Sequence, residues 1–138
     1  MNILDKEYKL DDKAIMISET DTKGIITYVN RAFCKASGYT KEELIGKPHN
    51  ILRHPSMPKV LFERIWFNLK SSKAWSGAIK NLRQDGTYYW INAEIVPVND
   101  ENKMTLYYMA AYRELSEKNR DEAELMYEQE RLNENFNN

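Results

Sequence analysis

Apolar and polar residues alternate along five short stretches of this chain, which is typical of β-strands. These stretches cover residues 14–20, 25–29, 75–82, 87–98 and 104–112. Turn-forming residues separate neighbouring stretches at Asp21-Thr22-Lys23-Gly24, Gln84-Asp85-Gly86 and Asn99-Asp100-Glu101-Asn102. Since short turns join strands that run in opposite directions, the pattern predicts antiparallel hairpins near both ends of the domain.

The segment between the two groups of strands has the spacing of short helices. Residues 30–38 predict one helix ending at Gly38. Thr40 and Glu43 have the spacing of a capping box, which predicts a single helical turn that stops at Gly46. Residues 60–69 predict a longer amphipathic helix, because their apolar side chains recur at the spacing of one helix face. These side chains are Leu61, Phe62, Ile65, Trp66 and Leu69.

Two other segments complete the pattern. Prolines at positions 48, 55 and 58 exclude a continuous helix over residues 47–58. The charge-rich residues from Glu114 onward predict a C-terminal helix. The expected fold is therefore α+β, with a five-stranded antiparallel sheet and short helices on one of its faces.

Composition narrows the classes of protein. The 138 residues fit one domain, and the formal net charge of −1 gives no reason to expect nucleic acid as a partner. The single cysteine, Cys34, forms no internal disulfide or zinc site and suits a reducing cytoplasm. No apolar run approaches the roughly 20 residues that span a bilayer. The chain also lacks a nucleophile elbow and a phosphate-binding glycine loop, so we do not expect an enzyme.

The middle of the chain is locally cationic. Eight basic residues occur between positions 47 and 83, against the single acid Glu63. The proline-containing loop there holds Arg53 together with His49, His54 and Asn50. Such a loop can hold donors in fixed directions toward an anionic ligand. The alternative interpretation is a surface connector whose prolines only prevent helix formation.

The motifs of residues 14–113 resemble those of PAS domains. Asp21-x-x-Gly24-x-Ile26-x-Tyr28-x-Asn30-x-x-Phe33 resembles the first PAS hairpin and the helix after it. Ser37-Gly38-Tyr39-Thr40-x-x-Glu43-Leu44-Ile45-Gly46 resembles the usual continuation. The resemblance implies a PAS sensory domain over 14–113, an N-terminal cap over 1–13 and a C-terminal signalling or linker helix over 114–138.

Four further blocks resemble the FAD-binding PAS domain of bacterial aerotaxis receptors. They are Pro48-His49-Asn50-Ile51-Leu52-Arg53-His54-Pro55-x-Met57-Pro58, then Phe62 and Trp66, then Trp75-Ser76-Gly77-x-x-Lys80-Asn81, and Gly86-x-x-Tyr89-Trp90. The residues that match the family's flavin-pocket positions are Asn30, Arg53, His54, Trp66, Trp75, Asn81 and Tyr89. One position differs, because the family commonly has aspartate where this chain has Ser56.

The resemblance implies a cytoplasmic redox or energy sensor that holds FAD non-covalently. Its implied partner is a chemotaxis receptor or signalling protein, in the same chain or another. A homodimer is a further expectation. We expect no direct insertion into a membrane. Two alternatives remain open at this stage. One is a haem-binding PAS oxygen sensor with His49 or His54 as the axial ligand, and the other is a ligand-free PAS interaction module.

Cys34 requires a separate interpretation, because light-sensing PAS domains use a cysteine that attacks the flavin ring. In those proteins the cysteine belongs to an Asn-Cys-Arg motif in the loop region, where this chain has Asn50-Ile51-Leu52-Arg53. Cys34 lies instead in the predicted helix after the first hairpin. We therefore expect Cys34 to be a buried apolar residue.

Overall fold

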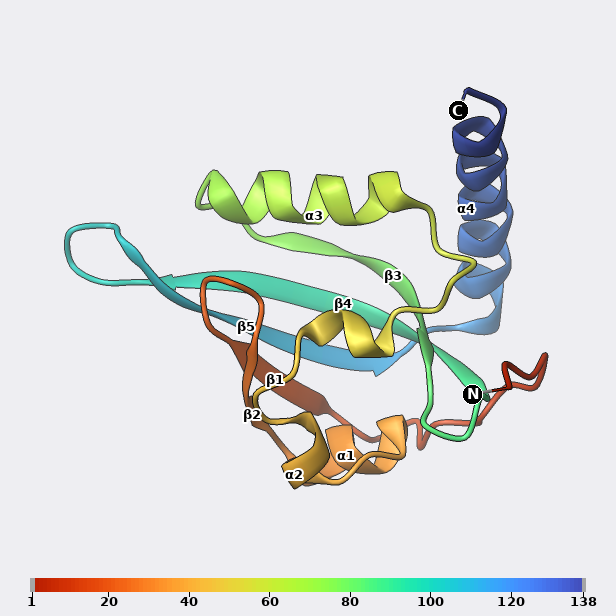
Figure 1. Ribbon diagram of the computed structural model, residues 1–138, viewed down its shortest axis with the longest axis horizontal. Coiled ribbons are helices and arrows are strands. Elements are labelled where there is room, and N and C mark those ends of the chain that lie inside the picture. The colour runs from red at the N-terminus through yellow and green to blue at the C-terminus, as the bar shows by residue number, and fades with distance from the viewer. Residues whose placement is uncertain (1, 138) are drawn as a thin grey trace.

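The computed structural model describes residues 2–137 and contains a five-stranded antiparallel sheet, which confirms the predicted fold class. The strands follow the spatial order β2-β1-β5-β4-β3 (Figure 1). Their bounds are β1 Met16–Thr20, β2 Ile26–Val29, β3 Trp75–Leu82, β4 Tyr88–Asn99 and β5 Thr105–Glu114. The last strand pairs with the first, with Met16 opposite Tyr112 and Thr20 opposite Tyr108. This long-range pairing joins the two predicted groups of strands into one sheet.

Alternation along the strands gives the sheet an inner face that is mostly buried. In β1, Met16, Ser18 and Thr20 are buried, and the residues between them are partly exposed. The other strands contribute Ile79 and Asn81 from β3, Tyr89, Ile91 and Ala93 from β4, and Tyr108, Ala110 and Tyr112 from β5. The helices between the two groups of strands cover this face.

The first helices begin and end where the sequence predicts. Helix α1 (Arg31–Ser37) begins at the N-cap Asn30 and ends at Gly38, which has the left-handed φ of 78° that favours glycine. Helix α2 (Lys41–Leu44) has the expected capping box of Thr40 and Glu43. A short 3₁₀ helix, η1 (His49–Leu52), lies inside the proline-rich loop, where we expected no continuous helix. This turn directs His49 toward the sheet.

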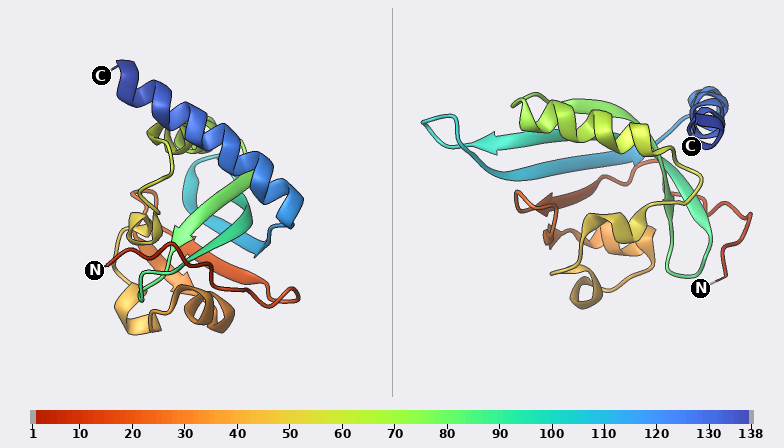
Figure 2. Two further views of the ribbon diagram at one scale, coloured as in Figure 1. Left: turned by 90° about the vertical axis from the view of Figure 1, so that its right-hand side faces the viewer. Right: turned by 45° about the horizontal axis from the view of Figure 1, so that its top comes forward.

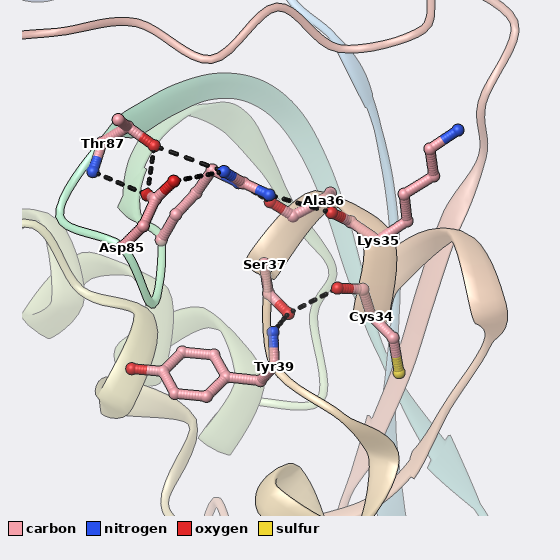
Figure 3. A network of polar contacts seen from close by, with 8 residues as sticks. Cys34, Lys35, Ala36, Ser37, Tyr39, Asp85 and Thr87 are labelled. Atoms are coloured by element: carbon pink, nitrogen blue, oxygen red, sulfur yellow. Dashed lines mark hydrogen bonds and ion pairs between the residues drawn. The ribbon is translucent and has the colours of Figure 1, made fainter.

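Arg83 ties α1 to the hairpin between β3 and β4. Its Nε donates to the carbonyl of Ala36 at 2.7 Å, and its Nη1 lies 3.0 Å from Asp85. Thr87 also donates to Asp85, so the hairpin holds the carboxylate in place (Figure 3). The side chain of Arg83 therefore has a structural role, although it belongs to the cationic middle of the chain.

Helix α3 (Lys59–Lys70) runs along the inner side of β3 and β4 and forms one wall of the domain (Figure 1). It buries Leu61, Ile65 and Leu69. Its N-terminal end points toward the C-terminal helix α4 (Glu117–Asn137), where Arg64 forms a bidentate ion pair with Glu130 at 2.5 and 3.1 Å. The two helices are therefore connected directly.

Helix α4 packs against the opposite face of the sheet (Figure 2). Trp90 lies between the inward residues Tyr89 and Ile91, so its ring points outward, where it stacks on Tyr127 with a centroid separation of 6.3 Å. The hydroxyl of Tyr127 donates to the carbonyl of Ala78 in β3 at 2.7 Å. No helix within residues 2–137 is both long and apolar enough to cross a membrane.

The segment before β1 lies beside the start of β4 and is not helical over residues 2–10. Tyr88 donates its backbone N–H to Lys6, and Tyr8 donates its own to Tyr88. Leu10 is buried in the core. The segment that we assigned to an N-terminal cap therefore pairs in parallel with the start of β4, through a bridge between Glu7 and Tyr88.

Candidate functional site

A cavity of about 240 Å³ lies between the inner face of the sheet, η1 and α3. The first hairpin closes one side, through Gly24 in its turn. The lining residues are Ser18, Thr20, Lys23, Gly24, Pro48, His49, Asn50, Arg53, Phe62, Ile65, Trp66, Leu69, Ile79, Asn81, Ile95, Tyr108, Met109, Ala110 and Tyr112. Most of this surface is apolar, and a few polar groups are gathered on it. That combination is typical of small-molecule and cofactor sites.

Aromatic side chains form one wall of the cavity. Trp66 of α3 packs edge-to-face on Tyr108 of β5, with ring centroids 5.5 Å apart. Gly24 lies beside the indole, and a Cβ at this position would lie 3.3 Å from Trp66 Cζ2. Gly24 also has a φ of 84°, which favours glycine. Both this backbone conformation and the close contact with Trp66 therefore favour glycine at position 24. The hairpin turn therefore fits closely against Trp66.

Arg53 places a guanidinium on the cavity wall. Its Cζ lies 3.6 Å from the centroid of the Phe62 ring, a cation–π contact that fixes the side chain. Within residues 2–137, the guanidinium makes no hydrogen bond or ion pair with another side chain or carbonyl. Burial lowers the pKa of Arg53 from its ordinary value. Arginine remains charged at neutral pH, so its donors are available to a ligand in the cavity.

Asn81 provides a second polar group on the wall. It is 5% exposed, and its Nδ2 donates to the hydroxyl of Tyr89 at 3.4 Å. Burial raises the pKa of Tyr89 to about 12, so this phenol stays protonated at neutral pH. Asn81 lies opposite Arg53, because the backbones of these two residues form an isolated β-bridge. The amide thus offers both a donor and an acceptor near the guanidinium.

Ser18, His49 and Tyr112 form a polar triangle on another part of the wall, in which Ser18 and Tyr112 are buried and His49 is half-buried. His49 Nε2 lies 3.2 Å from Ser18 Oγ and 3.0 Å from the Tyr112 hydroxyl. The two hydroxyl oxygens lie 3.0 Å apart. Burial lowers the pKa of His49 to about 4, although a hydrogen bond to its own backbone acts in the opposite direction. Burial also raises the pKa of Tyr112. All three groups are therefore neutral near pH 7.

The structure brings three of the sequence-predicted site residues, Arg53, Trp66 and Asn81, into the cavity wall. Asn30, His54, Trp75 and Tyr89 are not among the lining residues. The amide of Asn30 is engaged by the backbone, since it accepts from Phe33 and Ile17 and donates to Ile15. The indole of Trp75 lies over Gly77, where an added Cβ would approach it to 2.8 Å.

His54 lies on the opposite side of the loop from Arg53. The loop is extended at Arg53, and neighbouring side chains of an extended segment point to opposite sides. His54 packs edge-to-face on Tyr88, and its Nδ1 lies 2.7 Å from the hydroxyl of Ser56. Burial, followed by the charges of Lys80 and Arg131, lowers the pKa of His54 to about 4. Ser56, where the family commonly has aspartate, thus contacts a neutral histidine.

The three residues of the polar triangle, Ser18, His49 and Tyr112, were not in the predicted flavin set. The sequence placed His49 in the loop expected to face an anionic ligand and offered it as a metal or haem ligand, but it did not single out Ser18 or Tyr112. The alternation of residues in the predicted strands indicated that Ser18 and Tyr112 point inward. It did not indicate that their side chains contact each other. His49 Nε2 is occupied by two hydroxyl groups, so both contacts would have to break before it could bind haem iron. Within residues 2–137, no three histidine, cysteine or acidic side chains are grouped closely enough to hold a metal ion.

Residues 26–112 match the family described as PAS fold. The chain belongs to the PAS-fold family. The matched residues run from β2 through most of β5 and include every lining residue of the cavity except Ser18, Thr20, Lys23 and Gly24. The predicted PAS resemblance is therefore confirmed at the level of fold and family.

Two curated relatives show the kinds of protein in which similar PAS domains occur. The aerotaxis receptor of Escherichia coli K12 is 46% identical over 98 residues, which are 71% of this chain and 19% of the receptor. A nitrogen fixation regulatory protein of Klebsiella pneumoniae is 29% identical over 107 residues, covering 78% of this chain and 22% of that protein. The chain thus spans about a fifth of the length of these relatives.

Solved structures share the architecture of this PAS domain. The dark structure of the blue-light photoreceptor Aureochrome1 LOV has a TM-score of 0.71 at 22% identity, over 81% of this chain and 86% of that one. A PAS domain of a protein from Colwellia psychrerythraea has a TM-score of 0.63 at 30% identity, over 75% and 89%. The first comparison supports the fold alone, because its sequence identity is low.

Proposed function

We propose that this PAS domain binds FAD non-covalently and reports the redox state of the flavin to a chemotaxis signalling partner. The resemblance to the aerotaxis receptor of Escherichia coli, at 46% identity, supports this proposal. So does the retention of Arg53, Trp66 and Asn81 on one cavity wall. The protein would act as a sensor without a dedicated substrate rather than as a turnover enzyme.

The observation that carries the proposal is the guanidinium of Arg53 at the edge of an apolar cavity. Its donors face no protein acceptor within residues 2–137, and Phe62 holds it in place. Arg53 is exposed, so a ligand that enters the cavity can reach these donors. A flavin dinucleotide offers both ring carbonyls and phosphate oxygens, which match the planar donor fork of arginine.

The other wall residues suit a flat ring system. Trp66 and Tyr108 provide aromatic surface, and Ile79 and Ile95 provide aliphatic surface that excludes water. Asn81 can donate to and accept from the polar edge of a ring. The cavity of about 240 Å³ is smaller than the roughly 300–1,000 Å³ typical of sites for whole ligands. We therefore expect it to enclose only part of the dinucleotide.

Bound flavin would supply electron transfer, and the protein would convert its state into a structural signal. Helix α3 contributes Phe62, Ile65, Trp66 and Leu69 to the cavity, and the same helix pairs with α4 through Arg64 and Glu130. A shift of α3 at the cavity wall would therefore be transmitted directly to α4 through this ion pair. We propose that α4 leads to the partner, in the same chain or another, in the cytoplasm and in association with a membrane receptor.

The absorption spectrum of protein purified under native conditions tests this function. We expect the two blue and near-ultraviolet bands of oxidised flavin, with FAD released on denaturation and identified by chromatography. An intense Soret band would instead indicate haem. A colourless, folded protein that does not take up added FAD would contradict the proposal and favour a PAS interaction module without a ligand.

A further inference from the structure

The triangle of Ser18, His49 and Tyr112 has no assigned role in the proposed flavin site. Its three side chains come from β1, η1 and β5, and all three line the cavity. Each polar atom lies within 3.0–3.2 Å of the other two. Each contact is a hydrogen bond only if a hydrogen lies between its two atoms, so three hydrogen bonds would require three hydrogens.

The count depends on which nitrogen of the neutral His49 ring carries the hydrogen. If Nε2 carries none, the two hydroxyl hydrogens can both be used inside the triangle, and no donor remains for the cavity. If Nε2 carries the hydrogen, it donates to one hydroxyl oxygen, and that hydroxyl donates to the other. The second hydroxyl then has no acceptor within the triangle, because Nε2 no longer accepts. One hydroxyl hydrogen is left for a group in the cavity.

We propose that this triangle is a reversible hydrogen-bond contact for the cavity ligand, which acts as a donor in one tautomer of His49 and as an acceptor in the other. The inference rests on the proposed flavin function and specifies its ligand contact. An oxidised flavin has a ring nitrogen that accepts a hydrogen bond, and the same nitrogen carries a hydrogen when the flavin is reduced. A contact that exchanges donor for acceptor can satisfy both forms without moving the backbone.

The surroundings of His49 favour a change of tautomer over a change of charge. Arg53 faces the same cavity, and its positive charge disfavours an imidazolium at His49. Lys23 adds a second cation to the cavity lining, whereas the neighbouring rings of Phe33 and Tyr112 carry no charge. Within residues 2–137, no carboxylate forms an ion pair with His49. Burial and these cations therefore hold the ring neutral, and its hydrogen can change nitrogen if the hydrogen bond to its own backbone breaks.

Nitrogen-15 NMR of the histidine rings tests the inference in the full chain with bound FAD. The chain has two histidines, so His54→Gln identifies the signals of His49 without ambiguity. We expect the hydrogen on Nε2 when the flavin is oxidised and on Nδ1 after reduction with dithionite. The flavin spectrum of the same sample verifies occupancy and redox state.

The variants separate this role from simple packing. Ser18→Ala combined with Tyr112→Phe removes both hydroxyls, and we expect the His49 tautomer to become insensitive to reduction. Tyr108→Phe is the matched control, because Tyr108 lines the same cavity from the same strand and face but lies outside the triangle. In Tyr108→Phe, the tautomer of His49 should still change when the flavin is reduced.

The outcomes distinguish the two proposals. If FAD binds and wild-type His49 keeps one tautomer in both redox states, the triangle is not such a contact, although the flavin function stands. If the wild-type protein takes up no FAD, the proposed function fails and this inference fails with it. Because the wild-type comparison is decisive alone, a variant that does not fold leaves the test intact.

Discussion

The carboxylate of Glu134 accepts a hydrogen bond of 2.8 Å from the backbone N–H of Val60, across 74 positions of sequence. Its other oxygen accepts from the N–H of Lys59 at 3.1 Å. Helix α3 begins after Pro58 and has no side-chain cap of its own. The C-terminal helix thus caps the helix that forms the cavity wall, and a negative charge at this end also complements the helix dipole.

Glu134→Ala should loosen the connection between α3 and α4. Loss of an N-cap typically costs about 0.5–2 kcal/mol, and we expect a fall in unfolding free energy within that range. Amide hydrogen exchange should increase at the start of α3 and in the last turns of α4. Glu128→Ala is the matched control, since Glu128 is an exposed acid of the same helix. Equal stability and exchange in both variants would show that the cap does not hold the helices together.

Cys34→Ala should leave flavin binding and the blue-light spectrum unchanged. Cys34 is in α1, outside the cavity lining, and its backbone carbonyl accepts from Ser37 (Figure 3). Burial raises the pKa of its thiol, which keeps it protonated and poorly nucleophilic at neutral pH. Absorption spectra before and after blue illumination check this. A reversible light-induced adduct that disappears in the variant would contradict this placement.

Stability should decrease as the pH falls from about 6.5 to about 4. The folded-state pKa values of His49 and His54 are about 4, below the ordinary value of 6.5, because burial disfavours the charged rings. Between these values the unfolded chain binds more protons than the folded protein, so acidification favours unfolding. For His49 we expect a loss on the order of 2–3 kcal/mol across this window.

Urea unfolding at several pH values between about 7 and 4.5 measures this dependence. His54→Gln removes one of the two groups, so its slope of stability against pH should be shallower than that of the wild type. Parallel slopes would mean that His54 has an ordinary pKa in the folded protein. The carboxylates are the same in both proteins, so the comparison isolates the histidine.

Local patterns were sufficient to predict most of the fold. The alternation in residues 14–20 and 104–112 and the capping box of Thr40 and Glu43 depend on neighbouring residues, and all appear in the structure. The pairing of β1 with β5 is not a local property, and the sequence predicted one five-stranded sheet without indicating which strands are neighbours. Packing of α4 on the outer face also depends on a distant contact, between Trp90 and Tyr127.

The candidate site was less predictable, because side-chain direction depends on long-range backbone pairing. Arg53 and His54 are adjacent, and the sequence predicted that both face the cofactor. Only the β-bridge of Arg53 with Asn81 determines that Arg53 faces the cavity and His54 faces Tyr88. The contact of Ser18 with Tyr112 joins positions 94 residues apart, so no local motif contains it.

Titration of apo-protein with FAD, comparing wild type with Arg53→Ala, tests the central claim most directly. A charge-assisted hydrogen bond contributes about 1.5–3 kcal/mol, so we expect the dissociation constant to rise by about ten- to a hundredfold. Arg113→Ala is the matched control, because Arg113 is an exposed arginine of β5 outside the cavity lining. It should bind FAD as the wild type does. Equal dissociation constants for wild type and Arg53→Ala would contradict the placement of the flavin in this cavity.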